Sequence, residues 1–189
     1  MAKRGPYGKG EAKRKEILRA ALEVFADEGY RGTSLRKVAA RCAISLPGLM
    51  HYFDSKEDLL TQVLRMRDEA AHARQEERGA SLSYREIIKE GSGTPGLVEL
   101  FVSMAAAASD PAHPAHAHFA RRYPVLREQV VASLRSRMDT GTIRTGIVPA
   151  ERLAVLLIAV VDGIQLQWLV DRSVDMRQAA DDVMALLEV

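Results

Sequence analysis

Residues 33–60 read TSLRKVAARCAISLPGLMHYFDSKEDLL. Two short apolar patterns begin within this stretch, one after Thr33-Ser34 and one after Ser45. Serine and threonine are preferred residues at the N-cap of a helix, so Thr33 or Ser34 can cap the first helix and Ser45 the second. Pro47 falls in the first turn of the second pattern, where its missing N–H costs little. The stretch therefore predicts two short helices joined by a tight turn, which is a helix-turn-helix unit.

A helix-turn-helix unit fits the major groove of DNA when the first turn of its second helix approaches the base edges closely. Residues 45–48 read SLPG, and three of the four are small enough to permit that approach. Hydrogen-bond donors around both helices suit contacts with phosphates. The candidate DNA-binding residues are Thr33, Ser34, Arg36, Lys37, Ser45, Leu46, Pro47, Gly48, His51, Tyr52 and Lys56.

Some of these residues have a purely structural alternative. Tyr52 is either a phosphate contact or a half-buried core aromatic with its hydroxyl outward. Leu46 is either an exposed apolar residue or a contact to a thymine methyl group. His51 fits a surface position better than a metal site.

The regions on either side of the unit are also predicted to be helical. Residues 1–10 are basic and glycine-rich and lack apolar periodicity, which predicts a flexible arm. An amphipathic pattern over residues 13–28 predicts a helix that Gly29 ends. Ser55 and Asp58 resemble a capping box, which opens a long helix over residues 56–78. We expect a joint at residues 79–94, with a short amphipathic piece at 84–90.

Further helices are predicted over residues 95–110, 115–140, 150–171 and 175–188, with Pro124 as a candidate break. No long segment alternates with the period of a strand. The predicted fold is all-α, with about nine helices: a three-helix DNA-binding head and a larger C-terminal helical domain that binds a ligand and dimerises. The predicted divisions are a basic arm (1–10), a helix-turn-helix domain (11–55) and the ligand-binding and dimerisation domain (56–189).

Charge is distributed unevenly along the chain. Residues 1–56 hold twelve Lys and Arg against six Asp and Glu, although the whole chain has a net charge of only +2. A basic end on a mildly acidic body favours a head that binds a polyanion. The single cysteine, Cys42, excludes an intramolecular disulfide, which fits a reducing cytoplasm.

The sequence resembles the TetR family of transcriptional regulators over about residues 13–60. The matching segments are Gly29-Tyr30, residues 33–36, Val38-Ala39, Ile44-Ser45, residues 49–53, residues 55–57 and Leu59-Leu60. The resemblance implies a homodimer with its third helix in the major groove. It also implies a divergent C-terminal domain that binds a small ligand and dimerises through its last two long helices.

Carried over position by position, the resemblance places Arg36 and residues 45–48 against bases. Thr33, His51, Tyr52 and Lys56 would then contact the DNA backbone. Two positions depart from the family pattern: Met50 stands where an aromatic residue is frequent, and Ala43 stands at the turn. Met50 removes a hydroxyl that could contact phosphate, whereas Ala43 leaves the turn feasible.

Residues 153–170 read LAVLLIAVVDGIQLQWLV, which is too apolar for a surface helix and too short in its longest apolar run for a membrane span. With the final helix, this segment predicts a four-helix seam about a twofold axis. The alternative is a core helix inside a monomer. A dimer would match a pseudo-palindromic operator in double-stranded DNA.

An effector pocket is expected among the helices of residues 56–170. The candidate lining residues are Met66, Met104, Phe119, Tyr123, Gln165 and Trp168. The alternative is that these are ordinary core residues.

Three other motifs carry little weight. Residues 91–96 satisfy G-x-G-x-x-G, but no strand precedes them. Glu69 and His72 lack the second copy that a di-iron bundle needs. His113, His116 and His118 follow a proline and fit a loop or a pocket lining better than a zinc site.

Taken together, these features predict a cytoplasmic, dimeric transcriptional regulator, a repressor that a small-molecule effector releases from its operator. We expect no enzymatic activity, no cofactor, no metal and no membrane association. The alternatives are a ligand-sensing helical adaptor that does not bind DNA, and a helical metal-binding enzyme.

Overall fold

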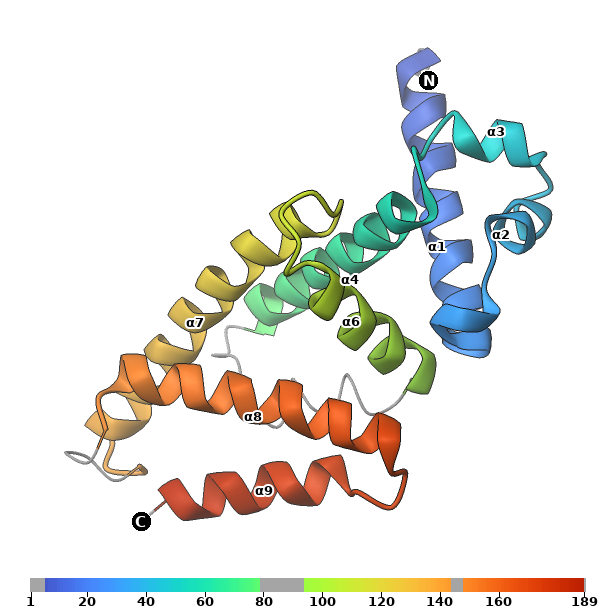
Figure 1. Ribbon diagram of the computed structural model, residues 1–189. Coiled ribbons are helices and arrows are strands. Elements are labelled where there is room, and N and C mark those ends of the chain that lie inside the picture. Colours follow the sequence, from blue (N-terminus) through green and yellow to red (C-terminus); the bar gives the residue numbers. More distant parts are fainter. Residues whose placement is uncertain (1–5, 79–93, 144–147, 189) are drawn as a thin grey trace.

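The computed structural model describes residues 6–78, 94–143 and 148–188 (Figure 1). These residues form eight α-helices and contain no β-strand. The helices are α1 (Pro6–Gly32), α2 (Leu35–Arg41), α3 (Leu46–Met50), α4 (Lys56–Arg78), α6 (Pro95–Ala107), α7 (His116–Asp139), α8 (Ala150–Val170) and α9 (Met176–Leu187). The prediction of an all-α fold is confirmed. The predicted amphipathic piece at residues 84–90 lies outside the described residues.

Both boundaries of the first helix differ from the sequence-based expectation. The first helix begins at Pro6 instead of Lys13, so residues 6–10 are helical and not part of an arm. Proline is favoured at the first position of a helix because the backbone N–H that it lacks would have no partner within the helix there. At Gly29 the backbone leaves helical geometry (φ 70°, ψ 178°), but a further turn continues to Gly32.

The seventh helix runs without a break through Pro124. A proline inside a helix removes one backbone hydrogen bond. Both Pro124 and Ala120, whose carbonyl loses that bond, are exposed, so water can satisfy the freed oxygen. The candidate break at this position was therefore wrong.

The first three helices form the head of the molecule, with α2 and α3 lying on one side of α1 (Figure 1). Side chains from all three helices, and from the segment that follows α3, meet inside the head and are completely or almost completely buried. The largest are Ile17, Phe25, Val38, Leu49 and Phe53. Their burial is the main force that holds the two short helices in place, since helices of five and seven residues have little stability alone.

Two hydrophobic clusters make up the core. The first joins the head to α4, α6 and the start of α7, and it includes Leu60, Val63 and Phe101. The second lies among α6, α7, α8 and α9, and it includes Val98 and Leu157. The predicted domain boundary at residue 56 is therefore not a boundary between clusters, because the head and the long fourth helix share one core.

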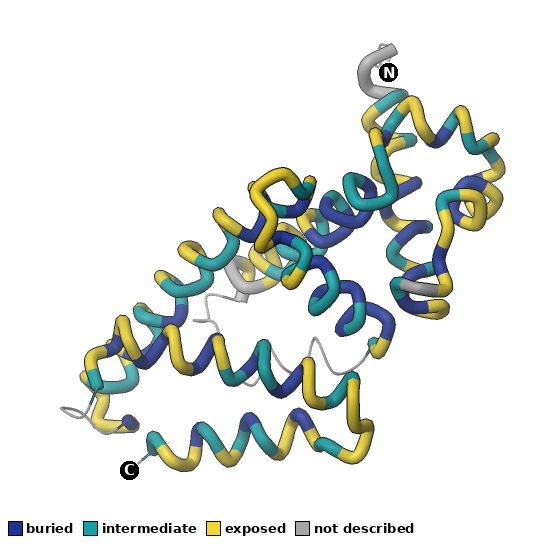
Figure 2. The backbone as a smooth tube through the Cα atoms, in the orientation of Figure 1, coloured by how far each residue is buried: buried dark blue, intermediate teal, exposed yellow. Residues whose placement is uncertain are grey.

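The last two helices, α8 and α9, lie side by side (Figure 1). By length and composition α8 could cross a membrane, but the core helix of a soluble protein passes the same test, and a single such helix is weak evidence. One face of α8 is buried against its neighbours, whereas Val155, Leu156, Leu166 and Val170 are more than half exposed (Figure 2). Leu186 of α9 is 76% exposed.

Candidate DNA interface and effector-binding body

The helix-turn-helix unit forms where the sequence predicts it. Ser34 caps α2, because its hydroxyl accepts a hydrogen bond from the backbone N–H of Lys37 at 3.4 Å. Ser45 caps α3 in the same way and accepts from the N–H of Gly48 at 3.1 Å. The turn between them passes through Ala43, which adopts a left-handed conformation with φ 52°. A small residue tolerates this conformation at modest cost.

The first turn of α3 lies at the surface of the head. Ser45 and Pro47 are exposed, and Leu46 and Gly48 are partly exposed, with Leu46 packing its inner side against the core. A Cβ atom at Gly48 would lie 3.2 Å from the Ser45 hydroxyl, so glycine keeps the capping hydrogen bond uncrowded. This turn presents small side chains and backbone, which is the surface that close approach to base edges requires.

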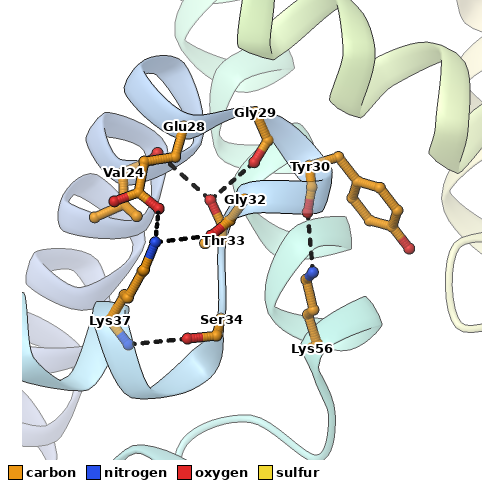
Figure 3. A network of polar contacts seen from close by, with 9 residues as sticks. All are labelled: Val24, Glu28, Gly29, Tyr30, Gly32, Thr33, Ser34, Lys37 and Lys56. Atoms are coloured by element: carbon orange, nitrogen blue, oxygen red, sulfur yellow. Dashed lines mark hydrogen bonds and ion pairs between the residues drawn. The ribbon is translucent and has the colours of Figure 1, made fainter.

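The three cationic side chains of α2 differ in whether an acidic residue pairs with them. Arg36 is exposed, and among the described residues no hydrogen bond or ion pair engages its guanidinium. Lys37 instead pairs with Glu28 and donates to the carbonyl of Gly32 at 3.0 Å (Figure 3). Arg41 pairs with Glu23 of α1 at 2.9 Å. Of these three cations, only Arg36 is available to a phosphate or base without first leaving an acidic partner.

The position of Thr33 differs from the prediction. Its side chain is 3% exposed, and its hydroxyl donates to the carbonyl of Gly29 at 2.9 Å (Figure 3). This hydrogen bond satisfies a carbonyl at the point where the first helix kinks. The Thr33 hydroxyl is therefore occupied inside the head and does not reach the surface as a phosphate donor.

The residues after α3 also divide between the surface and the interior. His51 is exposed, and Tyr52 is half-buried with its ring 6.5 Å from that of Phe53. Lys56 donates to the carbonyl of Tyr30 at 3.0 Å, and its ammonium lies 4.7 Å from the centre of the Tyr30 ring (Figure 3). Lys56 thus ties the start of α4 to the end of α1.

The candidate effector-binding residues lie in or against the two hydrophobic clusters. Met104 and Phe119 are buried in the first cluster, against which Met66 and Tyr123 pack partly exposed. Trp168 packs against the second cluster, and the Arg172 guanidinium lies 3.7 Å from the centre of its ring. Tyr123 also packs against the second cluster, so it belongs to the surroundings of both groups of candidates.

A polar pair, Tyr123 and Asp162, connects α7 to α8. The Tyr123 hydroxyl donates to an Asp162 carboxylate oxygen at 2.8 Å. Burial raises the pKa of the Asp162 carboxyl, and burial together with the nearby Asp162 charge raises the pKa of Tyr123. Gln165, one turn further along α8, is 8% exposed, and its amide oxygen has no hydrogen-bond partner in the part of the chain that the structure describes.

A second polar cluster lies between α4 and α7. Arg122 donates to Asp68 at 2.9 Å and covers the Phe101 ring, and Nε2 of buried His118 lies 3.4 Å from Asp68. Burial lowers the pKa of His118; the Asp68 charge opposes this shift, and the neighbouring arginines add to it. Sequence patterns did not predict this cluster, because Asp68 of α4 is 54 residues from Arg122 along the chain.

The other two histidines after Asp110 hold the turn before α7. Nδ1 of His113 accepts from the N–H of Ala115, and Nδ1 of His116 lies 2.9 Å from the carbonyl of Ala108. No group of three metal-ligating side chains is found in residues 6–78, 94–143 and 148–188. His72 lies 2.9 Å from the Gln129 amide nitrogen.

The comparisons with known proteins match the head most strongly. Residues 17–63 match the family described as bacterial regulatory proteins, tetR family. The chain is 31% identical over 103 residues to the transcriptional repressor KstR2 of Rhodococcus jostii (strain RHA1), a match that covers 54% of this chain and 46% of that protein. The chain therefore spans less than half the length of this curated relative.

The whole fold is similar to solved structures. A TetR transcription regulator from Haloarcula marismortui superimposes with a TM-score of 0.74 at 18% identity, covering 95% of this chain and 100% of that one. Thermus thermophilus FadR, a repressor in complex with lauroyl-CoA, superimposes with a TM-score of 0.58 at 22% identity, covering 92% of each chain. These relatives are regulators, not enzymes.

Proposed function

We propose that this chain, which belongs to the tetR family of bacterial regulatory proteins, binds a pseudo-palindromic operator as a homodimer and represses transcription until a small-molecule effector releases it. It acts in the cytoplasm, without a cofactor. The observation that carries the proposal is the surface of the head, where the uncrowded first turn of α3 lies on the same three-helix unit as Arg36, an exposed cation with no ion-pair partner among the described residues.

In this proposal α3 enters the major groove, and residues 45–48 face the bases. Arg36, which is exposed on α2, contacts a base or a phosphate in this proposal, and the exposed His51 and half-buried Tyr52 supply contacts to the DNA backbone. Lys37 and Lys56 are secondary, because an acidic or carbonyl partner already binds each ammonium group. Ser34 and Ser45 act through the helix N-termini that they cap, where backbone N–H groups favour phosphate.

The exposed apolar side chains of α8 support dimerisation. Leu156, Leu166 and Val170 recur along the helix, and Leu186 of the neighbouring α9 is exposed as well. Exposed apolar side chains gathered on neighbouring helices are costly in water and typical of a surface that a partner covers. A second copy that placed its α8 and α9 against this face would make a four-helix seam and carry two heads on one twofold axis.

The shared core between head and body supports release by an effector. Since α6 belongs to both hydrophobic clusters, a ligand that displaces α6 also moves the contact between α6 and α1. In one state of the dimer the two heads match the spacing of the operator half-sites, and in the other they do not. An effector that binds the second state more tightly lowers the affinity for DNA by the difference between its affinities for the two states. A coupling of about 1–3 kcal/mol corresponds to a roughly five- to 150-fold change in affinity.

The experiment is a gel-shift titration of the purified chain with the DNA upstream of its own gene, with excess nonspecific competitor, at two salt concentrations. Arg36→Ala is compared with Arg121→Ala, which removes an exposed arginine of α7. We expect Arg36→Ala to weaken binding by about 1–3 kcal/mol and Arg121→Ala to leave it unchanged. Failure of the unaltered chain to retain this DNA, or equal affinity of both variants, would count against the proposal.

A further inference from the structure

The Tyr123–Asp162 pair lies where the two hydrophobic clusters meet. Tyr123 packs against side chains of both clusters, and its ring centre lies 6.0 Å from that of buried Phe119. Asp162 comes from α8, a helix whose other inward residues are almost all aliphatic. Asp162 is partly buried, and a carboxylate is costly to take even partly out of water unless it is well hydrogen-bonded. Among the described residues its one hydrogen bond comes from Tyr123.

Gln165 adds a second polar group on the same side of α8. Residues three apart in a helix lie on one face, one above the other, so Asp162 and Gln165 occupy neighbouring positions along that face. The Gln165 side chain is more than nine-tenths buried, and its amide oxygen finds no donor among the described residues. An unmet acceptor in a protein interior is unusual enough to need an explanation.

Three of the groups at this place can accept a further hydrogen bond. A carboxylate accepts only, and the Tyr123 hydroxyl has already given its one proton to Asp162, which leaves its oxygen as an acceptor. The Gln165 amide oxygen is a third acceptor. The neighbouring cation, Arg122, is held by Asp68 and the Phe101 ring. The faces of Phe119 and Tyr123 are attractive to a cation as well.

We propose that the effector of this regulator is an organic amine, an apolar molecule whose protonated nitrogen donates to Asp162 and to the Gln165 amide oxygen. This inference rests on the proposed function, in which the body binds an effector. An amine meets the open acceptors and offsets the Asp162 charge, whereas a carboxylate of the same shape would be repelled by Asp162 and has no proton to donate to the Gln165 amide oxygen. The charge of the effector's head group and its ability to donate hydrogen bonds therefore distinguish an amine from a carboxylic acid.

Trp168, the only tryptophan of the chain, reports on this place. It lies one helical turn beyond Gln165, so its fluorescence follows binding without any DNA in the sample. The probes are phenylbutylamine, phenylbutanol and phenylbutyrate, which share one apolar body and differ only in the head group. We expect saturable binding of the amine with an affinity at least about tenfold above that of the alcohol or the acid.

The variants are Asp162→Asn, which keeps an acceptor for Tyr123 but removes the charge, and Gln165→Leu, which replaces the unmet amide by an apolar group of similar size. Each is expected to lose about tenfold in amine affinity, and the control Asp182→Asn, an exposed position on α9, to lose none. Circular dichroism shows that each variant is folded; if Asp162→Asn is not, Gln165→Leu carries the test alone.

Equal binding of the three probes, preference for the acid, no saturable binding of the amine, or full amine affinity in the folded variants would each overturn the inference. The outcome is separate from the test of DNA binding, because no DNA is present. A chain that binds its operator but shows no preference for the amine would overturn the effector class and leave the proposed regulator in place.

Discussion

The backbone of Gly96, in the first turn of α6, lies so close to the end of α1 that a Cβ atom on it would sit 2.1 Å from the carbonyl oxygen of Phe25. The carbonyl oxygen of Ala26 would be 2.8 Å away. Further along the same contact, a Cβ atom at Gly29 would sit 2.3 Å from a carboxylate oxygen of Glu99. At Gly96 the head and the body therefore meet backbone against backbone, where a larger residue does not fit, whereas Gly29 is approached by the side chain of Glu99.

Replacing Gly96 by alanine should push α6 away from α1. Overpacking of this kind costs about 1–3 kcal/mol, because the obstructing atoms belong to the backbone and cannot rotate away. Urea unfolding measures the loss in the free energy of unfolding. Gly10→Ala is the control, since nothing lies within 4 Å of a Cβ atom there, and it should gain up to about 1 kcal/mol from helix propensity. Equal stability of Gly96→Ala and the unaltered chain would contradict the close contact.

Lys56→Met should destabilise the fold. The substitution keeps the length of the side chain but leaves the Tyr30 carbonyl without the donor that lies 3.0 Å away, and a hydrogen bond from a charged group contributes about 1.5–3 kcal/mol. The melting temperature should fall, whereas Arg36→Ala should leave it unchanged, since no partner among the described residues is lost. A melting temperature for Lys56→Met equal to that of the unaltered chain would show that the hydrogen bond to Tyr30 does not stabilise the fold.

The stability of the chain should fall as the pH drops below about 6.5, in part because of His118. Burial holds the pKa of His118 below its usual 6.5, with Arg122, Arg65 and Arg121 acting in the same direction and Asp68 against it. The unfolded chain then takes up a proton that the folded chain resists, so stability rises with pH through this window and is complete above it.

Urea unfolding at about pH 7.5 and about pH 5.5 measures this dependence. His118→Gln should lose less stability between the two pH values than the unaltered chain does. His51→Gln, which changes an exposed histidine, should lose the same amount as the unaltered chain. An identical loss in all three proteins would exclude His118 as a cause.

Leu166→Lys should separate the proposed dimer. Leu166 is 53% exposed on the apolar face of α8, and a lysine there would bury an unpaired charge in the seam. Light scattering should give twice the chain mass of 20.8 kDa for the unaltered protein and the single mass for the variant. Val125→Lys changes a similarly exposed residue on α7 and should remain dimeric. A monomeric unaltered chain would contradict the proposed assembly.

Local signals predicted most of the fold. Ser34, Ser45 and Ser55 were found from sequence because a capping residue acts within three positions of itself, and all three hydroxyls accept the expected backbone hydrogen bond. The apolar periods likewise placed the helices from α4 onward. The start of α1 was missed because glycines at positions 8 and 10 weaken a helix without forbidding it.

The tertiary contacts were not predictable in the same way. Thr33 looked like a surface donor, yet the kink at Gly29 turns its hydroxyl inward. Lys37 lies nine residues from Glu28 along the chain, and their pairing depends on how α2 packs on α1. Gly96 carried no local signal at all, because the need for glycine arises from a carbonyl about seventy residues earlier. Asp162 was visible as a polar residue in an apolar run, but its partner was not.

Selection from a pool of random DNA duplexes tests the proposal that this chain reads DNA, without assuming where its operator lies. The purified protein is incubated with the pool at moderate salt, and the retained duplexes are amplified and sequenced over several rounds. We expect an inverted repeat whose two half-sites match the twofold symmetry of a dimer, and Arg36→Ala should retain it more weakly. Retention of duplexes without any shared sequence, at the level of an unrelated control protein, would contradict the account.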